Sequence, residues 1–196
     1  MNAFSIKRKP DYISWEQLAE CQQHAHKSNK NKGVLMKSAN YTADELRNAV
    51  KDGITLVALD DAGALVGELS ILYKQVNRWW HKGTAAYICY VAVIPEYQGK
   101  GVYSALSKLA TELVLQDGVG VQFLNTHVNN MSARKAYEKD GYKRVRFSPG
   151  SRSDYYSVEM AKWLSAKKNS VICRLMFLIT EFLVRLYYKP GKIRRF

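Results

Sequence analysis

The sequence predicts an α/β fold in which helices flank a mixed sheet. Strand-like and helix-like segments alternate over residues 1–164, an order that is typical of such sheets. Among them, an apolar run, Tyr87–Ile94, stops at Pro95 and leads through a glycine-containing loop into a helical pattern that begins at Val102. The 196 residues suit one domain with an appendage. We therefore predict a domain over residues 1–164 and a helical tail over residues 165–196.

The first half of the chain predicts two helices and three strands. Each helix begins with a capping box, in which Ser or Thr is followed three residues later by Gln or Glu, at Ser14–Gln17 and Thr42–Glu45. A turn signal at Asp60–Gly63 joins two strands into a hairpin. The expected elements are a strand over Phe4–Lys9, helices ending near His26 and Asp52, and strands over Ile54–Leu59 and Ala64–Lys74.

A loop rich in aromatic and basic residues, Asn77–Gly83, follows the hairpin. Its tryptophans either stack on a sugar or a nucleotide base, or cover the end of the core, and the sequence leaves both alternatives open. The remaining expected elements are strands over Thr84–Ile94, Gln122–Val128, Tyr142–Phe147 and Tyr155–Met160, and helices over Gly101–Gln116 and Ser132–Asp140.

The loop after Thr84–Ile94 has the features of an anion-binding site. Backbone amides in the first turn of a helix lack intrahelical acceptors, and the helix dipole makes that end positive. Gly99 and Gly101 allow a close approach of the backbone to a ligand, and Lys100 adds a positive charge. The pattern favours a phosphate or pyrophosphate, and its alternative is a plain strand–helix turn.

Two motifs make the chain resemble the GNAT family of N-acetyltransferases. The family's Gln/Arg–x–x–Gly–x–Gly/Ala motif is matched by Gln98 and Gly101, with Tyr103 in place of the last Gly or Ala. Its Asn–x–x–Ala–x–x–x–Tyr–Glu–Lys–x–Gly–Phe motif is matched at Asn130, Ala133, Tyr137, Glu138, Lys139 and Gly141, and Tyr142 replaces the Phe. The resemblance covers residues 6–164.

The resemblance implies the GNAT fold, with a mostly antiparallel sheet, and acetyl transfer from acetyl-CoA to a primary amine by direct attack. The pyrophosphate is expected on the backbone amides of Gln98–Val102, and the pantetheine beside Val91 and Val93. Asn130 is expected to orient the acetyl-CoA or the start of its own helix. The expected acetyl-CoA contacts are Val91, Ala92, Val93, Gln98, Gly99, Lys100, Gly101, Val102, Tyr103, Ser104 and Asn130.

The resemblance also suggests the catalytic groups. Tyr137 occupies the family's matching position for the acid that protonates the leaving thiolate, and packing in its helix is the alternative role. The base that takes the proton of the amine is Glu68 in the strand before the central one, His127 at the end of the next strand, or neither. The scattered Cys21, Cys89 and Cys173 have no metal-ligand spacing, so no metal is expected.

Most of the net charge of +13 lies in the last 36 residues, because residues 161–196 carry nine Lys or Arg and one acid. Within the tail, Val171–Tyr188 is apolar except for a narrow polar stripe that holds Arg174, Glu181 and Arg185. These three charges disfavour a spanning helix. Basic flanks around such a helix suit in-plane binding to an anionic membrane. The alternatives are packing on the domain and a homodimer interface, and nucleic acid is not expected.

Three functions fit these observations. The leading one is acetylation of a small amine, anionic or sugar-linked, which agrees with the basic catalytic region and the Arg78–Lys82 loop. The others are acetylation of protein or peptide amines, and a membrane-attached CoA-binding module without turnover. Met1–Pro10 lacks a signal-peptide pattern and the cysteines form no disulfide framework, so we expect a cytoplasmic protein, peripheral on the inner membrane face if the tail binds lipid.

Overall fold

The computed structural model describes residues 4–30, 34, 36–149, 156–164 and 170–187. In these residues seven strands form one sheet in the order β1-β2-β3-β4-β5-β7-β6. The chain divides into two compact units. The first unit is Met1–Lys74 with Ala86–Val119, and the second is Gln75–Ala85 with Gly120–Phe196. The boundary predicted at residue 164 therefore falls inside the second unit.

The strands of the first unit pair in chain order: β1 (Phe4–Arg8), β2 (Ile54–Asp60), β3 (Leu65–Arg78) and β4 (His81–Val93), of which the last two continue into the second unit. The β1–β2 and β2–β3 pairs are antiparallel. The register shifts between Ala58, opposite Gly67, and Leu59, opposite Leu65. Val66 is the extra residue, so a bulge lies next to Gly67.

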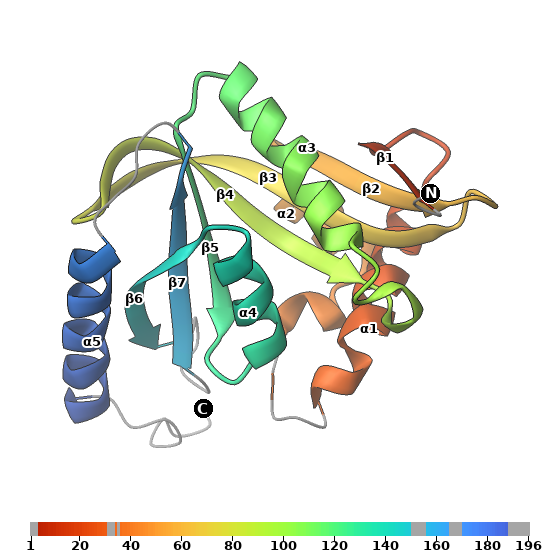
Figure 1. Ribbon diagram of the computed structural model, residues 1–196. Coiled ribbons are helices and arrows are strands. Elements are labelled where there is room, and N and C mark those ends of the chain that lie inside the picture. The colour runs from red at the N-terminus through yellow and green to blue at the C-terminus, as the bar shows by residue number, and fades with distance from the viewer. Residues whose placement is uncertain (1–3, 31–33, 35, 150–155, 165–169, 188–196) are drawn as a thin grey trace. The chain divides into compact units, whose positions relative to one another are not determined.

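The helices of the first unit are α1 (Trp15–Lys30), α2 (Ala43–Ala49) and α3 (Val102–Gln116), with short 3-10 helices η1 (Lys37–Asn40) and η2 (Pro95–Tyr97). Figure 1 shows α3 across one face of the strands and α1 and α2 on the other. Both predicted capping boxes are confirmed. Gln17 N donates to Ser14 Oγ at 3.3 Å, and Glu45 N donates to Thr42 Oγ1 at 3.2 Å.

The apolar core beside α1 and α2 consists of side chains with almost no exposed surface, among them Leu18, Leu46 and Val57. Leu18 belongs to the buried face of α1, which also contains Cys21 and Ala25. The same face also carries a polar side chain, Gln22, which is 0% exposed. A buried amide in an apolar face requires a hydrogen-bond partner, and the partner of Gln22 is the carbonyl of Tyr90 in β4.

The second unit contains β5 (Val121–His127), β6 (Lys143–Pro149) and β7 (Tyr156–Trp163), with β7 between the other two and antiparallel to both. Helix α4 (Met131–Lys139) precedes β6. Its end is closed by Gly141, which has a φ of 99°. Gly141 N donates to Glu138 O at 3.1 Å, and Tyr142 N donates to Tyr137 O at 3.0 Å, the pattern of a Schellman cap.

The tip of the β3–β4 hairpin, in the second unit, decides between the two roles that the sequence left open for Trp80. Trp80 is only 1% exposed, and its indole N–H donates to Glu159 Oε1 at 3.0 Å. Trp79 is 36% exposed and donates to Val145 O at 3.2 Å. Trp80 is thus not available to stack on a ligand, because its ring and its N–H are both used inside the unit. The alternative, that the tryptophans cover the end of the core, is confirmed for Trp80.

Helix α5 (Ser170–Tyr187) packs along β6 in the second unit (Figure 1). Phe177 is 6% exposed and meets the Phe147 ring edge-on, with centroids 6.0 Å apart. Thr180 Oγ1 accepts a hydrogen bond from Phe147 N at 3.0 Å, which satisfies a donor of this edge strand. Packing on the domain is therefore confirmed for one side of the helix. None of the helices in the described ranges is both long and apolar enough to cross a bilayer.

Candidate active site

The loop predicted to bind an anion joins β4 to α3 in the first unit. Gly99 and Gly101 both have left-handed φ angles, 77° and 88°, and Gly101 is the N-cap of α3. Residues with a Cβ adopt this conformation at a cost of about 1–2 kcal/mol. No other group lies within 4 Å of where a Cβ would stand on either glycine. The glycines are therefore needed for their conformation, and the space beside them is open.

The first turn of α3 presents amides toward this open loop. Ala105 N donates to Gly101 O at 3.0 Å. Val102 and Ser104 come before that bond, in the first turn, where backbone amides generally lack intrahelical acceptors. Two other amides expected to bind the pyrophosphate donate within the loop instead, Gln98 N to Pro95 O at 3.2 Å and Lys100 N to Tyr97 O at 3.4 Å.

The side chains of the loop fix it to its neighbours. Gln98 Nε2 donates to Val93 O at 2.9 Å, so the first residue of the Gln–x–x–Gly motif ties the loop to the end of β4. The Lys100 ammonium lies 5.0 Å from the centroid of the Tyr97 ring. A cation over an aromatic face is held by the ring quadrupole, which keeps this charge beside the two glycines.

Gly67 of β3 touches both sides of the same loop. A Cβ on Gly67 would lie 3.0 Å from Ala92 O and 3.0 Å from Val102 Cγ1. The neighbouring Val66 O accepts a hydrogen bond from Ile94 N at 3.0 Å. The backbones therefore approach closely at Gly67, and this contact holds the end of β4 against the start of α3.

The strand β4 is distorted just before Val91. Tyr90 has a φ of 51°, the only positive value at a non-glycine residue in the part of the chain that the structure describes. Gln22 Nε2 donates to Tyr90 O at 2.8 Å. A side chain of α1 thus takes a carbonyl that a regular strand would use in its ladder. Sequence reasoning missed both residues, and the available signal was the place of Gln22 four residues after Leu18, on the buried face of α1.

Glu68, the candidate base in the first unit, lies in β3 and is 1% exposed. Its Oε1 has no hydrogen-bond partner among the described residues. Burial raises the pKa of this carboxyl well above its usual range, and a smaller opposing effect comes from the Gln22 side chain. The proton is therefore retained to a higher pH than on an exposed glutamate. Such a shift brings a carboxyl closer to the working pH of a general base.

Tyr137 and Asn130 lie in the second unit, on α4. Tyr137 is 9% exposed, and its ring stands at 61° to that of Tyr142, with centroids 6.0 Å apart. Asn130 is the N-cap, and its Oδ1 accepts a hydrogen bond from Ala133 N at 3.4 Å. Of the two roles expected for Asn130, the structure shows orientation of the helix start.

His127 ends β5 in the second unit and is 4% exposed. Its Nδ1 accepts a hydrogen bond from Asn129 N at 3.0 Å, so the neutral ring carries its proton on Nε2. Burial lowers the pKa of the imidazole, which keeps the ring neutral at pH 7. The basic lone pair is already used by Asn129, which weakens His127 as the base.

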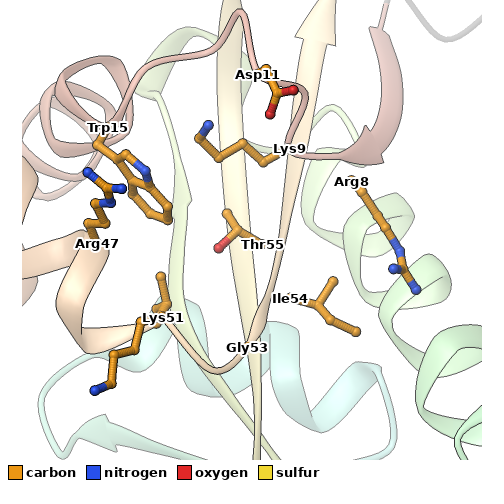
Figure 2. Close-up of a pocket in the computed structure, with 10 residues that line it drawn as sticks. Arg8, Lys9, Asp11, Trp15, Arg47, Lys51, Gly53, Ile54 and Thr55 are labelled. Carbon is orange, nitrogen blue, oxygen red and sulfur yellow. The ribbon is translucent and has the colours of Figure 1, made fainter.

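A separate cavity of about 530 Å³ opens in the first unit between β1, α1, α2 and β2. It contains none of the predicted site residues. Figure 2 shows Lys9 extending toward Trp15 and Arg47, whereas Arg8 and Lys51 extend away from them. Its cations therefore do not converge on one anion. Within the described ranges, no cluster of three or more His, Cys, Asp or Glu side chains could hold a metal ion.

Comparison with known sequences places these features in a family. Residues 15–142 match the model of the acetyltransferase (GNAT) family. Over 68 residues the chain is 31% identical to N-alpha-acetyltransferase 30 of Schizosaccharomyces pombe, a match that covers 34% of this chain and 45% of that protein. The chain thus spans less than half the length of this curated relative.

Solved structures share the same architecture. Nourseothricin acetyltransferase is 30% identical with a TM-score of 0.51, over 58% of this chain and 66% of that one. A chain in the crystal structure of the NatC complex bound to Gag peptide and CoA is 16% identical with a TM-score of 0.63, over 83% of this chain and 99% of that one. The family model covers more than half of the chain and includes both motifs. The chain therefore belongs to the acetyltransferase (GNAT) family and has the fold of that family.

Proposed function

We propose that this protein transfers an acetyl group from acetyl-CoA to a primary amine by direct attack of the amine on the thioester. The observation that carries the proposal is the pair of left-handed glycines, Gly99 and Gly101, at the N-terminus of α3. The open space beside them and the adjacent Lys100 suit a pyrophosphate. The residues present therefore fit acetyl-CoA, with its pyrophosphate at the N-terminus of α3, beside Gly99, Lys100 and Gly101.

The distortion at Tyr90 supports a role for the next residue in binding the thioester. A left-handed residue interrupts the regular ladder of a strand, and Gln22 takes the Tyr90 carbonyl. Val91 and Val93 are half-buried, while Ala92 between them is buried. In the proposal the pantetheine lies along these three residues. The Val91 amide then donates to the carbonyl oxygen of the thioester, whose developing negative charge it stabilises.

Two proton transfers complete the reaction. The amine must lose a proton to become a stable amide, and the thiolate of CoA must gain one. In the proposal Tyr137 supplies the second proton through its hydroxyl group. Glu68 takes the first, directly or through water, because its Oε1 has no partner in the described residues and its pKa is raised. The engaged Nδ1 of His127 favours Glu68 over His127.

The pH dependence of kcat/KM tests the base. Only deprotonated Glu68 accepts a proton, so kcat/KM is expected to rise with pH. The midpoint of this acidic limb should lie above 4.5, the ordinary pKa of a glutamate carboxyl. Glu68→Gln should remove this limb and lower the rate by about 10²–10⁴-fold, whereas His127→Ala should keep the limb. Loss of the limb only in His127→Ala would assign the base to His127. Retention in both variants would exclude both residues.

Thermal stability, measured beside the rate, distinguishes a catalytic role of Glu68 from a purely structural one. Because the pKa of Glu68 is raised in the folded state, folded protein binds more protons than unfolded protein above pH 4.5. The contribution of the Glu68 carboxyl to the free energy of unfolding is therefore full below that pH, and it declines as the pH rises through the folded-state pKa. Glu68→Gln should raise the melting temperature more at pH 8 than at pH 5. This stability change without a change in the rate profile would leave Glu68 as a buried structural acid.

For the acceptor, we propose a small amine that is anionic or linked to a sugar. The 30% identity to nourseothricin acetyltransferase supports a small molecule. Residues 1–160 carry 21 Lys or Arg and 16 Asp or Glu, and this excess of positive charge supports an anion. The similarity to N-alpha-acetyltransferase 30 favours the second candidate, the amino group of a peptide.

An acceptor screen tests this choice by measuring thiol release from acetyl-CoA. The panel contains neutral amino sugars, amino-sugar phosphates and nucleotides, and peptides with free N-termini. We expect release with the amino-sugar anions. Release with peptides alone would favour the second candidate, and thermal stabilisation by acetyl-CoA without release across a broad panel would indicate a binding module.

A further inference from the structure

Helix α5 has a side that is used for packing in the second unit. Cys173 and Phe177 are 2% and 6% exposed. Thr180 accepts the hydrogen bond from Phe147 N, and the Arg185 guanidinium lies 5.0 Å from the centroid of the Phe147 ring. These contacts fix the rotation of the helix about its axis. The opposite side of α5 therefore faces away from β6.

That opposite side is apolar without interruption. Eight side chains on it are 42–70% exposed: Val171, Ile172, Leu175, Leu178, Ile179, Phe182, Leu183 and Leu186. At 3.6 residues per turn they fill an arc of about 140° centred opposite the packed stripe. Arg174, Glu181 and Arg185 lie along one border of this arc, where Arg185 Nη2 pairs with Glu181 Oε1 at 2.9 Å. We call the eight residues the outer face of α5.

We propose that the outer face of α5 docks in plane on an anionic membrane surface. A contiguous apolar patch over more than four turns of a helix is unusual on a monomer in water. In the sequence, Lys167 and Lys168 precede the helix and Lys189, Lys192, Arg194 and Arg195 follow it. Cations at both ends of an apolar face complement lipid headgroups of negative charge. The packed side of α5 then couples the catalytic protein to that surface.

A second copy of the chain fits the same face less well. Pairing two α5 helices through their outer faces would bring two tails together, and residues 161–196 of each carry nine cations and one acid. Like charges at close range oppose association, whereas an anionic lipid surface attracts them. The positive charge of the tail therefore favours a membrane, and not a second copy of the chain, as the partner of the outer face.

Vesicle co-sedimentation of the full chain tests the proposal. We expect binding to phosphatidylcholine vesicles that contain 30% phosphatidylglycerol as the anionic lipid, and weaker binding to pure phosphatidylcholine. Raising the salt from about 0.1 M to 1 M should also weaken binding, because the Debye length falls from about 10 Å to about 3 Å. The double variant Leu175→Gln with Phe182→Gln should lower the partition coefficient at least about tenfold.

The matched control is Leu115→Gln on α3, because Leu115 is 48% exposed and lies far along the chain from the outer face. It should bind vesicles like the unchanged protein, and the urea midpoints of all variants should agree to show that each is folded. Vesicle binding that the double variant retains would overturn a role for the outer face. The alternative result in light scattering is a stable dimer that does not bind vesicles and that the double substitution dissociates. That result would overturn the membrane proposal and identify a second copy of the chain as the occupant. A monomer that does not bind vesicles would also overturn the proposal.

Discussion

Replacement of Tyr137 by Phe is expected to lower kcat about 10²–10⁴-fold and to leave the KM for acetyl-CoA within about twofold. The substitution removes only the hydroxyl group, which is the proton donor to the thiolate in the proposed reaction. The ring, which is 9% exposed and packs at 61° to Tyr142, is kept. Steady-state kinetics with acetyl-CoA at saturation and a urea titration measure the two effects separately.

Tyr142→Phe is the matched control, since it removes a hydroxyl from the other ring of the pair. The Tyr142 hydroxyl donates to Gln122 Oε1 at 3.1 Å, and the two side chains are 1% and 0% exposed. The control should therefore lose stability, by about 0.5–1.5 kcal/mol for the loss of one buried hydrogen bond, with little change in kcat. If Tyr137→Phe loses stability in the same way and keeps its kcat, Tyr137 is a packing residue and the acid lies elsewhere.

Gly101→Ala is expected to raise the KM for acetyl-CoA about tenfold, with a smaller effect on kcat. At a φ of 88° a Cβ introduces strain of about 1–2 kcal/mol, and about 1.4 kcal/mol corresponds to a factor of ten in affinity. The loop relieves that strain by changing the conformation at the N-cap of α3. This change moves the amides of Val102 and the following residues away from the pyrophosphate. Direct titration with acetyl-CoA measures the loss.

Gly63→Ala serves as the control for strain alone. Gly63 has a φ of 81°, no group stands within 4 Å of its Cβ position, and it lies in the turn between β2 and β3. Both substitutions should lower the melting temperature by a similar amount, because they introduce the same backbone strain. Only Gly101→Ala should weaken acetyl-CoA binding. Equal affinity in the two variants would mean that the α3 N-cap does not bind acetyl-CoA.

Local signals made much of the fold predictable from the sequence. The predicted capping box at Thr42 works within one helical turn and is confirmed, and the Gly141 cap of α4 is formed by equally local bonds. The Asp60–Gly63 turn is likewise built from neighbouring residues, with Asp60 Oδ1 accepting from Ala62 N and Ala64 N. Such interactions span few residues, so the residue types themselves specify them.

Long-range contacts set the parts that could not be predicted. Tyr90 has a left-handed φ that its residue type does not favour, and it is held by Gln22, 68 positions away in the sequence. Trp80 is buried through a hydrogen bond to Glu159, 79 positions away. The rotation of α5 likewise depends on Phe147 and Thr180, which only the folded second unit brings together. In each case tertiary packing decided between local alternatives.

The most direct test of acetyl-CoA binding at the α3 N-terminus is a pair of thermal melts, with acetyl-CoA and with S-acetylpantetheine, which lacks the pyrophosphate and the nucleotide. At about 100 times its Kd, acetyl-CoA should stabilise the fold by about 2.7 kcal/mol, a rise in melting temperature of about 5–10 °C. S-acetylpantetheine at the same concentration should have little effect, and Gly101→Ala should reduce the rise. The absence of any rise with acetyl-CoA, or an equal rise with both compounds, would contradict pyrophosphate binding at this turn.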